Sequence, residues 1–482
     1  MISATRTKIH VTRGLIALTA TPSALNCRKS VVSNVENVDF LVTSGGLGGA
    51  QTTVEQYIDE QRWPNVVRPP QARFQGLRAR DVTDRLEALL ESNDIALDTS
   101  SVPNMVVRDG QVIDRIVAEG WLGLAEGYLA GEWDAEPLPD VLNVLLSHEW
   151  EKKSGKLMGS LGSKSQRNFG TVRPGELPEG LVELYAGSTR ATGSALFSAA
   201  SRSSATEMVD VQTGSSKRST TQWPIDVTWY GTPESVERLD LDDAQVRRIE
   251  AMLDEAGVGP GDRVLELPSS GGQLAVEAAL RGASVDVLTS DEDHVEPVEA
   301  RVRAAGVAGA VRVITIDGPI PSPRQWSGTY DAIFSVERME TLGPGGMRHF
   351  LRTIDRMLAA GGRAVVQTCV ATDAMRETSK EALDVMRAYV WPALGYSTVS
   401  DIRNAAAKHT SLSISAESHL GSHLAATIPL WRANFAARER QAAAAGFDPV
   451  FRRLWEYQLA LHQCLAEAGE LDCVQFVFRP RS

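Results

Sequence analysis

The sequence predicts an α/β protein with a parallel, doubly wound sheet and flanking helices, preceded by a smaller N-terminal α+β module. From Asp242 to about residue 370, short apolar runs alternate with longer helical segments. Strands that alternate with helices in this way form parallel sheets covered on both faces. Ahead of residue 150 the alternation is missing, and short apolar runs surround one helical stretch, which indicates a separate unit.

The parallel-sheet region opens with an amphipathic helix. Its sequence, DDAQVRRIEAMLDEAG, begins with aspartates and ends at Gly257, and both are common helix boundary signals. More helices are expected after residue 372, and the apolar run at 473–479 predicts a terminal strand. Between the opening helix and residue 372 we expect strand 263–267, helix 273–282, strand 284–290, helix 295–306, strand 311–316, strand 330–336, helix 345–361 and strand 363–370.

The N-terminal half is less regular. Small and aromatic residues recur at helical spacing over 113–133, and 140–146 predicts a further short helix. Residues 151–175 are rich in Lys, Ser and Gly and predict a linker, while the polar stretch 199–225 predicts an exposed loop. The expected units are a disordered extension (1–60), the N-terminal module (61–150), a linker with a helical or loop region (151–235) and the parallel-sheet domain (236–482).

Length and composition limit the classes of function. A chain of 482 residues with 43% hydrophobic content is long enough for two or three domains. The net charge of -12 argues against a general nucleic-acid binder, because neutralising phosphates requires a basic surface. The four cysteines are scattered without a CxxC pair, so neither a disulfide framework nor a metal site is expected, and a cytoplasmic setting fits.

The first residues carry a separate signal. Residues 1–35 contain no acidic side chain, as is common in transit peptides. A disordered extension and a start codon assigned too early are the alternatives. No apolar run in the chain reaches the roughly 18 residues of a membrane-spanning helix.

The predicted fold places a ligand at the carboxyl ends of the strands, where the strand order reverses. The first strand-to-helix turn there reads ELPSSGGQ, from Glu266 to Gln273. An acid followed by glycines that open a helix is how a class I S-adenosylmethionine (SAM) methyltransferase holds its cofactor, so Glu266, Gly271 and Gly272 are candidate SAM ligands. An ordinary strand-to-helix turn is the alternative. The turn lacks GxGxxG spacing, which disfavours a nicotinamide or flavin cofactor.

Two further positions extend this candidate site. Thr289 ends the second strand, where the ribose of the cofactor would lie; the usual acid is absent there, although Asp291 follows closely. Asp317 ends the third strand, where the adenine lies in such folds. Solvated loop residues are the alternative for both acids. Because the carboxyl ends of parallel strands share one edge, we expect Glu266, Thr289 and Asp317 to converge there.

Several longer blocks resemble a known family. They are LDLDDAQVRRIEAMLDEAGVGPGDRVLEL, YDAIFSVERMETLGPGGMRHFLRTIDRMLAAGGRAVVQTCV, MRAYVWPALGYSTVSDI and LGSHLAATIPLWRANFAARERQAAAAGFDPVFRRLWEYQLA. Each is similar to a block of the cyclopropane-fatty-acid synthases, the mycolic acid cyclopropane synthases and related fatty-acid methyltransferases. IVAEGWLGLAEGYLAGEWDAEPLPDVLNVLL also resembles the N-terminal module of the longer synthases. Over about residues 110–150 and 170–482, the chain is identified as a diverged member of this family.

The resemblance implies a class I SAM methyltransferase that acts on the double bond of an unsaturated fatty acyl chain. In this family, methylation of a cis double bond leaves a cation, which loses a proton to close a cyclopropane or is converted to a methyl branch; a bound bicarbonate is the base. An apolar, aromatic tunnel must shield the cation. The implied partners are an unsaturated phospholipid or acyl chain and the inner face of a membrane, contacted peripherally from the cytoplasm. Whether the protein forms a homodimer is left undecided by the sequence.

The family's catalytic positions are partly kept. Glu340 falls on the glutamate that helps to hold bicarbonate, and the histidine that follows it in the family is Thr341 here. Gln367 stands where members have histidine or glutamine, and its amide can donate to an anion. The isoleucine two residues later is Cys369. The cysteine of the family's WxxYLxxC motif is His462, either a satisfied helix residue or a functional one.

The SAM motifs depart further from the family. Pro268 and Ser270 replace the first two glycines of ExGxGxGG, and Thr192 replaces a tyrosine that contacts SAM. Pro268 removes an N–H group and fixes φ in a loop that would need glycine freedom. The HYDLSND motif aligns with PGELPEG at 174–180. Three functions stay open: a lipid methyltransferase with a relaxed SAM site, a non-catalytic paralogue that binds lipid or an active partner, and a different small-molecule methyltransferase.

An apolar channel is expected to reach Glu340 and Gln367. Its predicted walls are 385–396 and 423–461, because these blocks match the family's acyl-binding regions and are rich in Leu, Ala and Trp.

A basic cluster near the end of the chain predicts a patch that meets anionic lipid. Solvated helix faces with internal ion pairs are the alternative. The cluster consists of Arg432, Arg438, Arg440, Arg452 and Arg453.

Overall fold

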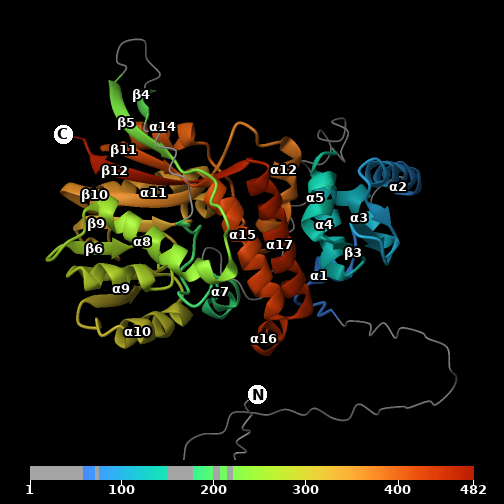
Figure 1. Cartoon of the computed structure of the whole chain (residues 1–482), viewed down its shortest axis with the longest axis horizontal. Coiled ribbons are helices and arrows are strands. Elements are labelled where there is room, and N and C mark those ends of the chain that lie inside the picture. The colour runs from blue at the N-terminus through green and yellow to red at the C-terminus, as the bar shows by residue number, and fades with distance from the viewer. Residues whose placement is uncertain (1–57, 71–74, 149–176, 199–206, 214–220, 482) are drawn as a thin grey trace, which may run out of the picture. The chain divides into compact units, whose positions relative to one another are not determined.

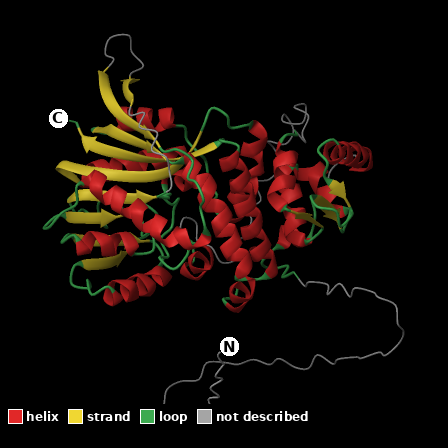
Figure 2. Ribbon diagram, in the orientation of Figure 1, coloured by secondary structure: helices red, strands yellow, loops and turns green. Residues whose placement is uncertain are grey.

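A computed structural model describes residues 58–70, 75–148, 177–198, 207–213 and 221–481 of the chain (Figures 1 and 2). The linker expected over 151–175 and nearly all of the extension expected over 1–60 lie outside these residues.

Nine of the described strands form one mixed sheet in the order β4-β5-β11-β12-β10-β9-β6-β7-β8. All neighbouring strands from β10 to β8 run parallel, which confirms the predicted doubly wound arrangement. β12 lies between β10 and β11 and is antiparallel to both. The bounds are β4 Glu207–Thr213, β5 Thr221–Trp229, β6 Arg263–Glu266, β7 Ser284–Thr289, β8 Val311–Thr315, β9 Tyr330–Val336, β10 Leu358–Ala371, β11 Leu412–His419 and β12 Leu471–Pro480.

Helices cover both faces of the sheet because consecutive strand residues point to opposite sides. Val264 and Phe334 pack in one core with α8 and α9, whereas their neighbours Leu265 and Ile333 pack in another core with α11 and α14. The main helices are α8 Leu241–Ala256, α9 Gln273–Leu280, α10 Val295–Ala304, α11 Gly343–Met357 and α14 Val399–His409. α8 ends at Gly257, which has a φ of 70°, as the sequence predicts.

A third group of helices lies between the sheet and the N-terminal module (Figure 1). None of the described helices is both long enough and apolar enough to cross a membrane. The group contains α7 Glu179–Tyr185, α12 Glu377–Ala382, α13 Asp384–Tyr389, α15 Gly421–Ala437, α16 Glu439–Ala444 and α17 Pro449–Glu467, and the short 3-10 helices of the chain are η2 Arg238–Asp240, η3 Glu292–His294 and η4 Met339–Leu342.

The N-terminal module is a small α+β unit, as predicted. The helical stretch expected over 113–133 is divided at Gly120, which has a φ of 58° that interrupts the helix, and its last residue, Trp133, begins a strand. Leu124 and Leu145 share a hydrophobic core with Trp455 of α17, so the module packs directly against the C-terminal helices. The elements are α1 Pro64–Val67, α2 Gln75–Glu91, β1 Ala96–Leu97, β2 Asn104–Val107, α3 Gln111–Glu119, α4 Trp121–Ala130, β3 Trp133–Glu136 and α5 Leu138–Leu146.

The prediction of an exposed loop over 199–225 is wrong for the described part of that stretch. β4 and β5 pair there as antiparallel strands, and β5 also joins β11 in parallel. Ile225 and Val227 alternate into the core with 0% and 1% exposure. The many Ser, Thr and Gln residues around them hide this short alternation, although Thr, Val and Trp favour strands.

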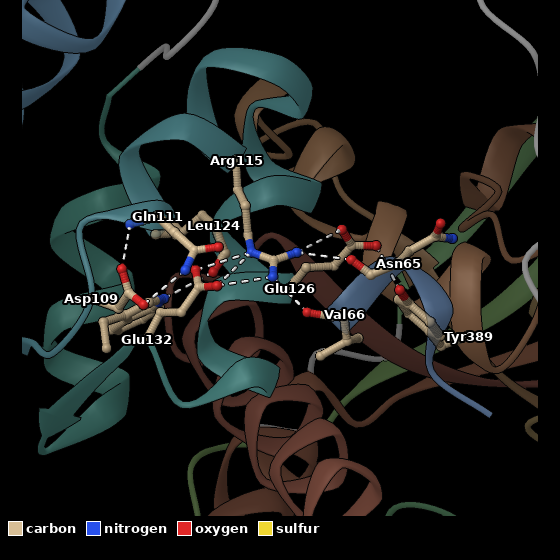
Figure 3. A network of polar contacts seen from close by, with 10 residues as sticks. Asn65, Val66, Asp109, Gln111, Arg115, Leu124, Glu126, Glu132 and Tyr389 are labelled. Carbon is tan, nitrogen blue, oxygen red and sulfur yellow. Dashed lines mark hydrogen bonds and ion pairs between the residues drawn. The ribbon is translucent and has the colours of Figure 1, made fainter. Parts of the chain in front are cut away.

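A buried ion network organises the N-terminal module (Figure 3). Arg115, only 1% exposed, lies 2.9 Å from a carboxylate oxygen of Glu132 and 3.8 Å from one of Glu126. The same guanidinium donates to the backbone oxygens of Asn65 and Val66, which begin α1. A buried charge needs such partners, since leaving one unpaired is strongly destabilising.

The network continues into the sheet domain. The Tyr389 hydroxyl at the end of α13 donates to Glu126 Oε1 at 2.6 Å (Figure 3). The N-terminal module is thereby fixed to the segment that leads from α13 toward Trp391.

Candidate active site

The main cavity lies where the strand order reverses. β6 has β7 on one side and β9 on the other, so the helical connections leave in opposite directions and their carboxyl ends open a crevice. Pro268 and Ser269 follow β6, and Val336 and Glu337 end β9; all four line the cavity. The cavity encloses about 1120 Å³ of empty space, including the part that is open to solvent.

One end of the cavity is formed by the loop after β6 and the segment at 190–193. Gly271 has a φ of 99°, and a Cβ atom built there would lie 2.1 Å from the backbone oxygen of Arg190. A side chain is therefore excluded at this position. Thr192 donates its N–H to Ser270 O at 3.1 Å, and this hydrogen bond holds the segment at 190–193 against the loop after β6. Gly272, with a φ of 86°, precedes the first residue of α9.

Glu266 is turned away from the cavity. Its side chain is 0% exposed, and Oε1 accepts both the N–H and the hydroxyl of Ser270, each at 2.5 Å. Burial raises the pKa of the Glu266 carboxyl, against the hydrogen bonds from Ser270 that lower it. Among the described residues, none donates to the buried second oxygen, Oε2. Ser270 thus takes up one oxygen of Glu266, the candidate cofactor ligand.

Thr289 and Asp317 lie at the same edge of the sheet as Glu266. Thr289 ends β7, and its backbone oxygen accepts the N–H of Ile316, the residue before Asp317. The Thr289 side chain is 1% exposed and accepts the N–H of Asp291 at 3.1 Å. Asp317 is exposed and accepts from Gln325 at 2.8 Å. The predicted shared edge is present, but none of these side chains lines the cavity.

Glu340 lies deep in the cavity wall, in η4. Its oxygens accept the Thr368 hydroxyl at 2.5 Å and the Cys369 N–H at 3.3 Å. Burial, reinforced by the nearby Glu337 carboxylate, raises the pKa of Glu340 to about 7. Carboxylate oxygens of Glu337 and Glu340 and the Cys369 sulfur lie within 4.8 Å of one another. The protonation of Glu340 therefore changes in the neutral range.

Gln367 lies behind this wall. It is 0% exposed, and its Nε2 donates to Glu337 Oε1 at 3.0 Å and to Ser194 O at 3.3 Å. Its Oε1 accepts from Gln475 at 2.9 Å. The amide therefore orients Glu337, which the sequence analysis did not single out, although Glu337 stands three residues before Glu340.

A second pair of polar groups reaches the cavity from elements far apart in the sequence. The Tyr396 hydroxyl lies 2.6 Å from His462 Nε2, and both residues line the cavity. His462 Nδ1 lies 2.9 Å from the backbone oxygen of Gln458, one turn earlier in α17. Burial lowers the pKa of His462 and raises that of Tyr396. Sequence reasoning noted His462 but gave no signal for its partner.

The remaining wall is apolar and aromatic. The predicted walls are present: Trp391, Leu394, Leu424, Ile428, Trp431, Trp455 and Leu459 line the cavity. Tyr185 of α7 adds an aromatic side that the sequence analysis missed, with its ring 5.3 Å from Trp431 and 5.8 Å from Trp455. The cavity thus joins the β6 loop to an aromatic channel, with Glu340 between them.

The basic cluster is largely turned inward. Arg432 pairs with Glu456 at 2.8 Å, Arg453 pairs with Asp134 at 2.6 Å, and Arg438 and Arg452 donate to backbone oxygens. Arg440 is exposed. These contacts correspond to the alternative of internal ion pairs.

Comparisons with known proteins agree with this arrangement. A family model described as mycolic acid cyclopropane synthetase matches residues 233–476. The chain is 27% identical over 432 residues to the tuberculostearic acid methyltransferase UfaA1 of Mycobacterium tuberculosis, covering 87% of this chain and 95% of the relative.

Solved structures show the same fold. The cyclopropane synthase MmaA2 from Mycobacterium tuberculosis is 18% identical, with a TM-score of 0.50 over 63% of this chain and 94% of that one. Coclaurine N-methyltransferase bound to N-methylheliamine and SAH is 14% identical, with a TM-score of 0.51 over 74% of this chain and 98% of that one.

Proposed function

This chain belongs to the mycolic acid cyclopropane synthetase family of SAM-dependent lipid methyltransferases, and on that basis we propose that it methylates the double bond of an unsaturated fatty acyl chain. The observation that carries the proposal is the single cavity that joins the β6 loop to the aromatic channel. A methyl donor and an acyl chain can meet there beside Glu340.

The cofactor end fits SAM. Gly271 lets the loop after β6 pack against Arg190 and still line the cavity, and the N-terminus of α9 that follows this loop favours a carboxylate. Thr192, Gly193, Ser269 and Gly271 of the cavity wall would hold the cofactor. When bound, SAM supplies an electrophilic methyl group. Glu266, Gly272, Thr289 and Asp317 would support this end from behind, as their positions at the sheet edge suggest.

The aromatic end fits an acyl chain. Leu424, Ile428 and Leu459 provide apolar contacts and exclude water from the reacting carbons. The faces of Trp391 and Trp455, whose rings lie 6.4 Å apart, can stabilise a cation on the chain.

Glu340 provides a negative charge at the junction of the two ends. As a carboxylate in a buried site, it stabilises positive charge more than it would in water. Bicarbonate, by contrast, fits this wall poorly. Glu337 and Glu340 already bring two carboxylates together, and the Gln367 amide that could bind an anion donates to Glu337. We therefore assign no step to bicarbonate.

A second function is favoured by the loop after β6. Ser270 donates two hydrogen bonds to Glu266, and Pro268 offers no N–H group to a ligand. A non-catalytic relative that binds lipid, or an active partner, would tolerate both changes. In either case we propose a cytoplasmic protein that meets the inner membrane face peripherally, because the lipid that it would methylate or bind is a membrane lipid.

Label transfer tests the proposal. Purified protein is incubated with methyl-labelled SAM and vesicles of a phosphatidylglycerol with monounsaturated chains; vesicles with saturated chains are the control. Label in the unsaturated lipid alone supports the enzyme, and chromatography of the released fatty acids separates a cyclopropane from a methyl branch. Vesicle binding without label transfer or SAM binding supports the non-catalytic alternative.

A further inference from the structure

We propose that Tyr396 and His462 together form the proton acceptor of the cavity, which takes up the proton that the methylated acyl chain must lose. This inference rests on the proposed function. It assigns the base to the protein's own side chains.

The hydrogen bonds of His462 fix its tautomer. A backbone oxygen only accepts, so the contact of 2.9 Å from Nδ1 to Gln458 O places a hydrogen on Nδ1. A neutral imidazole then carries a lone pair on Nε2, and this lone pair faces the Tyr396 hydroxyl at 2.6 Å. Burial keeps the ring neutral because it lowers the pKa of His462. Tyr396 is therefore the donor, and among the described residues none donates a hydrogen bond to its oxygen.

The pair reaches the same space as the reacting carbons. Both side chains line the cavity with Glu340 and Cys369. The charged or titratable groups that act on Tyr396 are Cys369, Glu340, Glu337 and Arg387, and Arg338 also lines the cavity. Burial lowers the pKa of His462, and the hydrogen bond to the Gln458 carbonyl opposes this effect only in part.

The proton transfer balances as follows. The π electrons of the double bond would form the new bond to the methyl carbon as the bond from that carbon to the SAM sulfur breaks. The electron pair of the broken bond would stay on the sulfur of SAH, and the neighbouring chain carbon would become a cation. A C–H bond of the added methyl group then breaks, and its electron pair closes a cyclopropane ring. Alternatively, a C–H bond beside the cation breaks and its electron pair forms a C=C bond.

In either case the proton moves to Tyr396 Oη while the original hydroxyl proton moves to His462 Nε2. The chain becomes neutral, tyrosine stays neutral and histidine becomes an imidazolium.

Glu340 is less suited to this role. Its two oxygens already accept hydrogen bonds from Thr368 and Cys369. Both hydrogen bonds lower the basicity of the carboxylate, which suits a charge that stabilises the cation and stays in place.

The resting state of the pair can be checked without cofactor. Nuclear magnetic resonance of isotope-labelled histidine reports the tautomer, and His462→Gln assigns the signal. We expect a neutral ring protonated at Nδ1, with an Nε2 signal that shifts in Tyr396→Phe. A hydrogen on Nε2, or a charged ring at neutral pH, would overturn the proposal because no acceptor would exist.

Reaction products test the role itself. In Tyr396→Phe and His462→Gln we expect the deprotonated product to form roughly 10²-fold more slowly, as for loss of a general base. SAH should form with a smaller loss, and part of the lipid should be an alcohol one water heavier, because water captures the cation. Tyr457→Phe is the matched control: Tyr457 lies in α17 outside the cavity, and its buried hydroxyl has no partner among the described residues.

The outcomes separate the two proposals. Variants that match the wild type in product ratio, or that lose SAH and lipid product by the same factor, would overturn the role of the pair. Thermal melting shows whether each variant is folded, and Tyr396→Phe, which keeps the ring, remains decisive if His462→Gln unfolds. A wild type that transfers no methyl group overturns the proposed function and the pair's role with it.

Discussion

Tyr389 donates its hydroxyl hydrogen to a carboxylate oxygen of Glu126 at 2.6 Å, so the N-terminal module holds the chain two residues before Trp391 of the cavity wall. Tyr389→Phe removes this hydrogen bond to a buried carboxylate. We expect a loss of roughly 1–3 kcal/mol in the free energy of unfolding and weaker binding of a fluorescent acyl lipid. Denaturant titration and fluorescence measure the two effects. Tyr457→Phe, which removes an unpartnered hydroxyl, should change neither, and equal effects in both variants would contradict the role of Glu126.

Glu340 should set the pH dependence of methyl transfer. Burial, with Glu337 second, raises the pKa of Glu340 to about 7, so the carboxylate forms as pH rises through that value. If its charge stabilises the cation, the initial rate of SAH formation rises across pH 7. Glu340→Gln should remove this rise and lower the rate at high pH by roughly 10²-fold. A wild-type rate that is flat across pH 7 would contradict this role.

His419 should make the fold less stable in alkaline solution. Burial alone lowers its pKa, but Asp472, at 2.6 Å, and Glu417 outweigh burial and raise the pKa to about 9. A raised folded-state pKa stabilises the protein fully below the unfolded value of about 6.5, and this stabilisation is lost as pH rises through the folded value. We expect a loss on the order of 2 kcal/mol between these limits, measured by urea unfolding. In His419→Asn the free energy of unfolding should depend less on pH over this interval. An unchanged pH dependence would refute the assignment of this loss to His419.

SAM should bind more weakly than in a relative with an intact glycine loop. By the motif resemblance, Pro268 and Ser270 stand where the family has glycines and Thr192 stands where it has a tyrosine, and we expect each such change to weaken binding by roughly 0.5–1.5 kcal/mol. Together these losses lower the affinity by roughly one to three powers of ten. Calorimetry should show this, and the combined variant Pro268→Gly, Ser270→Gly and Thr192→Tyr should recover binding. Micromolar or tighter binding of SAM by the wild type would contradict the prediction of a weakened SAM site.

The regular parts of the fold could be predicted because their signals are local. β9 spans 330–336 as predicted, since seven consecutive residues carry its apolar pattern. Glu340 was found for the same reason, because its motif surrounds it in the sequence. Tyr396 and His462 are 66 residues apart, and only the packing of α17 brings them together. Gln367 was named from the same block, but it lies behind the cavity wall, and its hydrogen bond with Gln475, 108 residues away, could not be foreseen.

β12 is the last of the nine strands in chain order, yet it lies in the interior of the sheet between β10 and β11. During synthesis, β4, β5 and β11 therefore cannot join the parallel half until Leu471–Pro480 has left the ribosome. Until then the nascent chain presents two open strand edges, one on β10 and one on β11, and such edges readily pair with other chains.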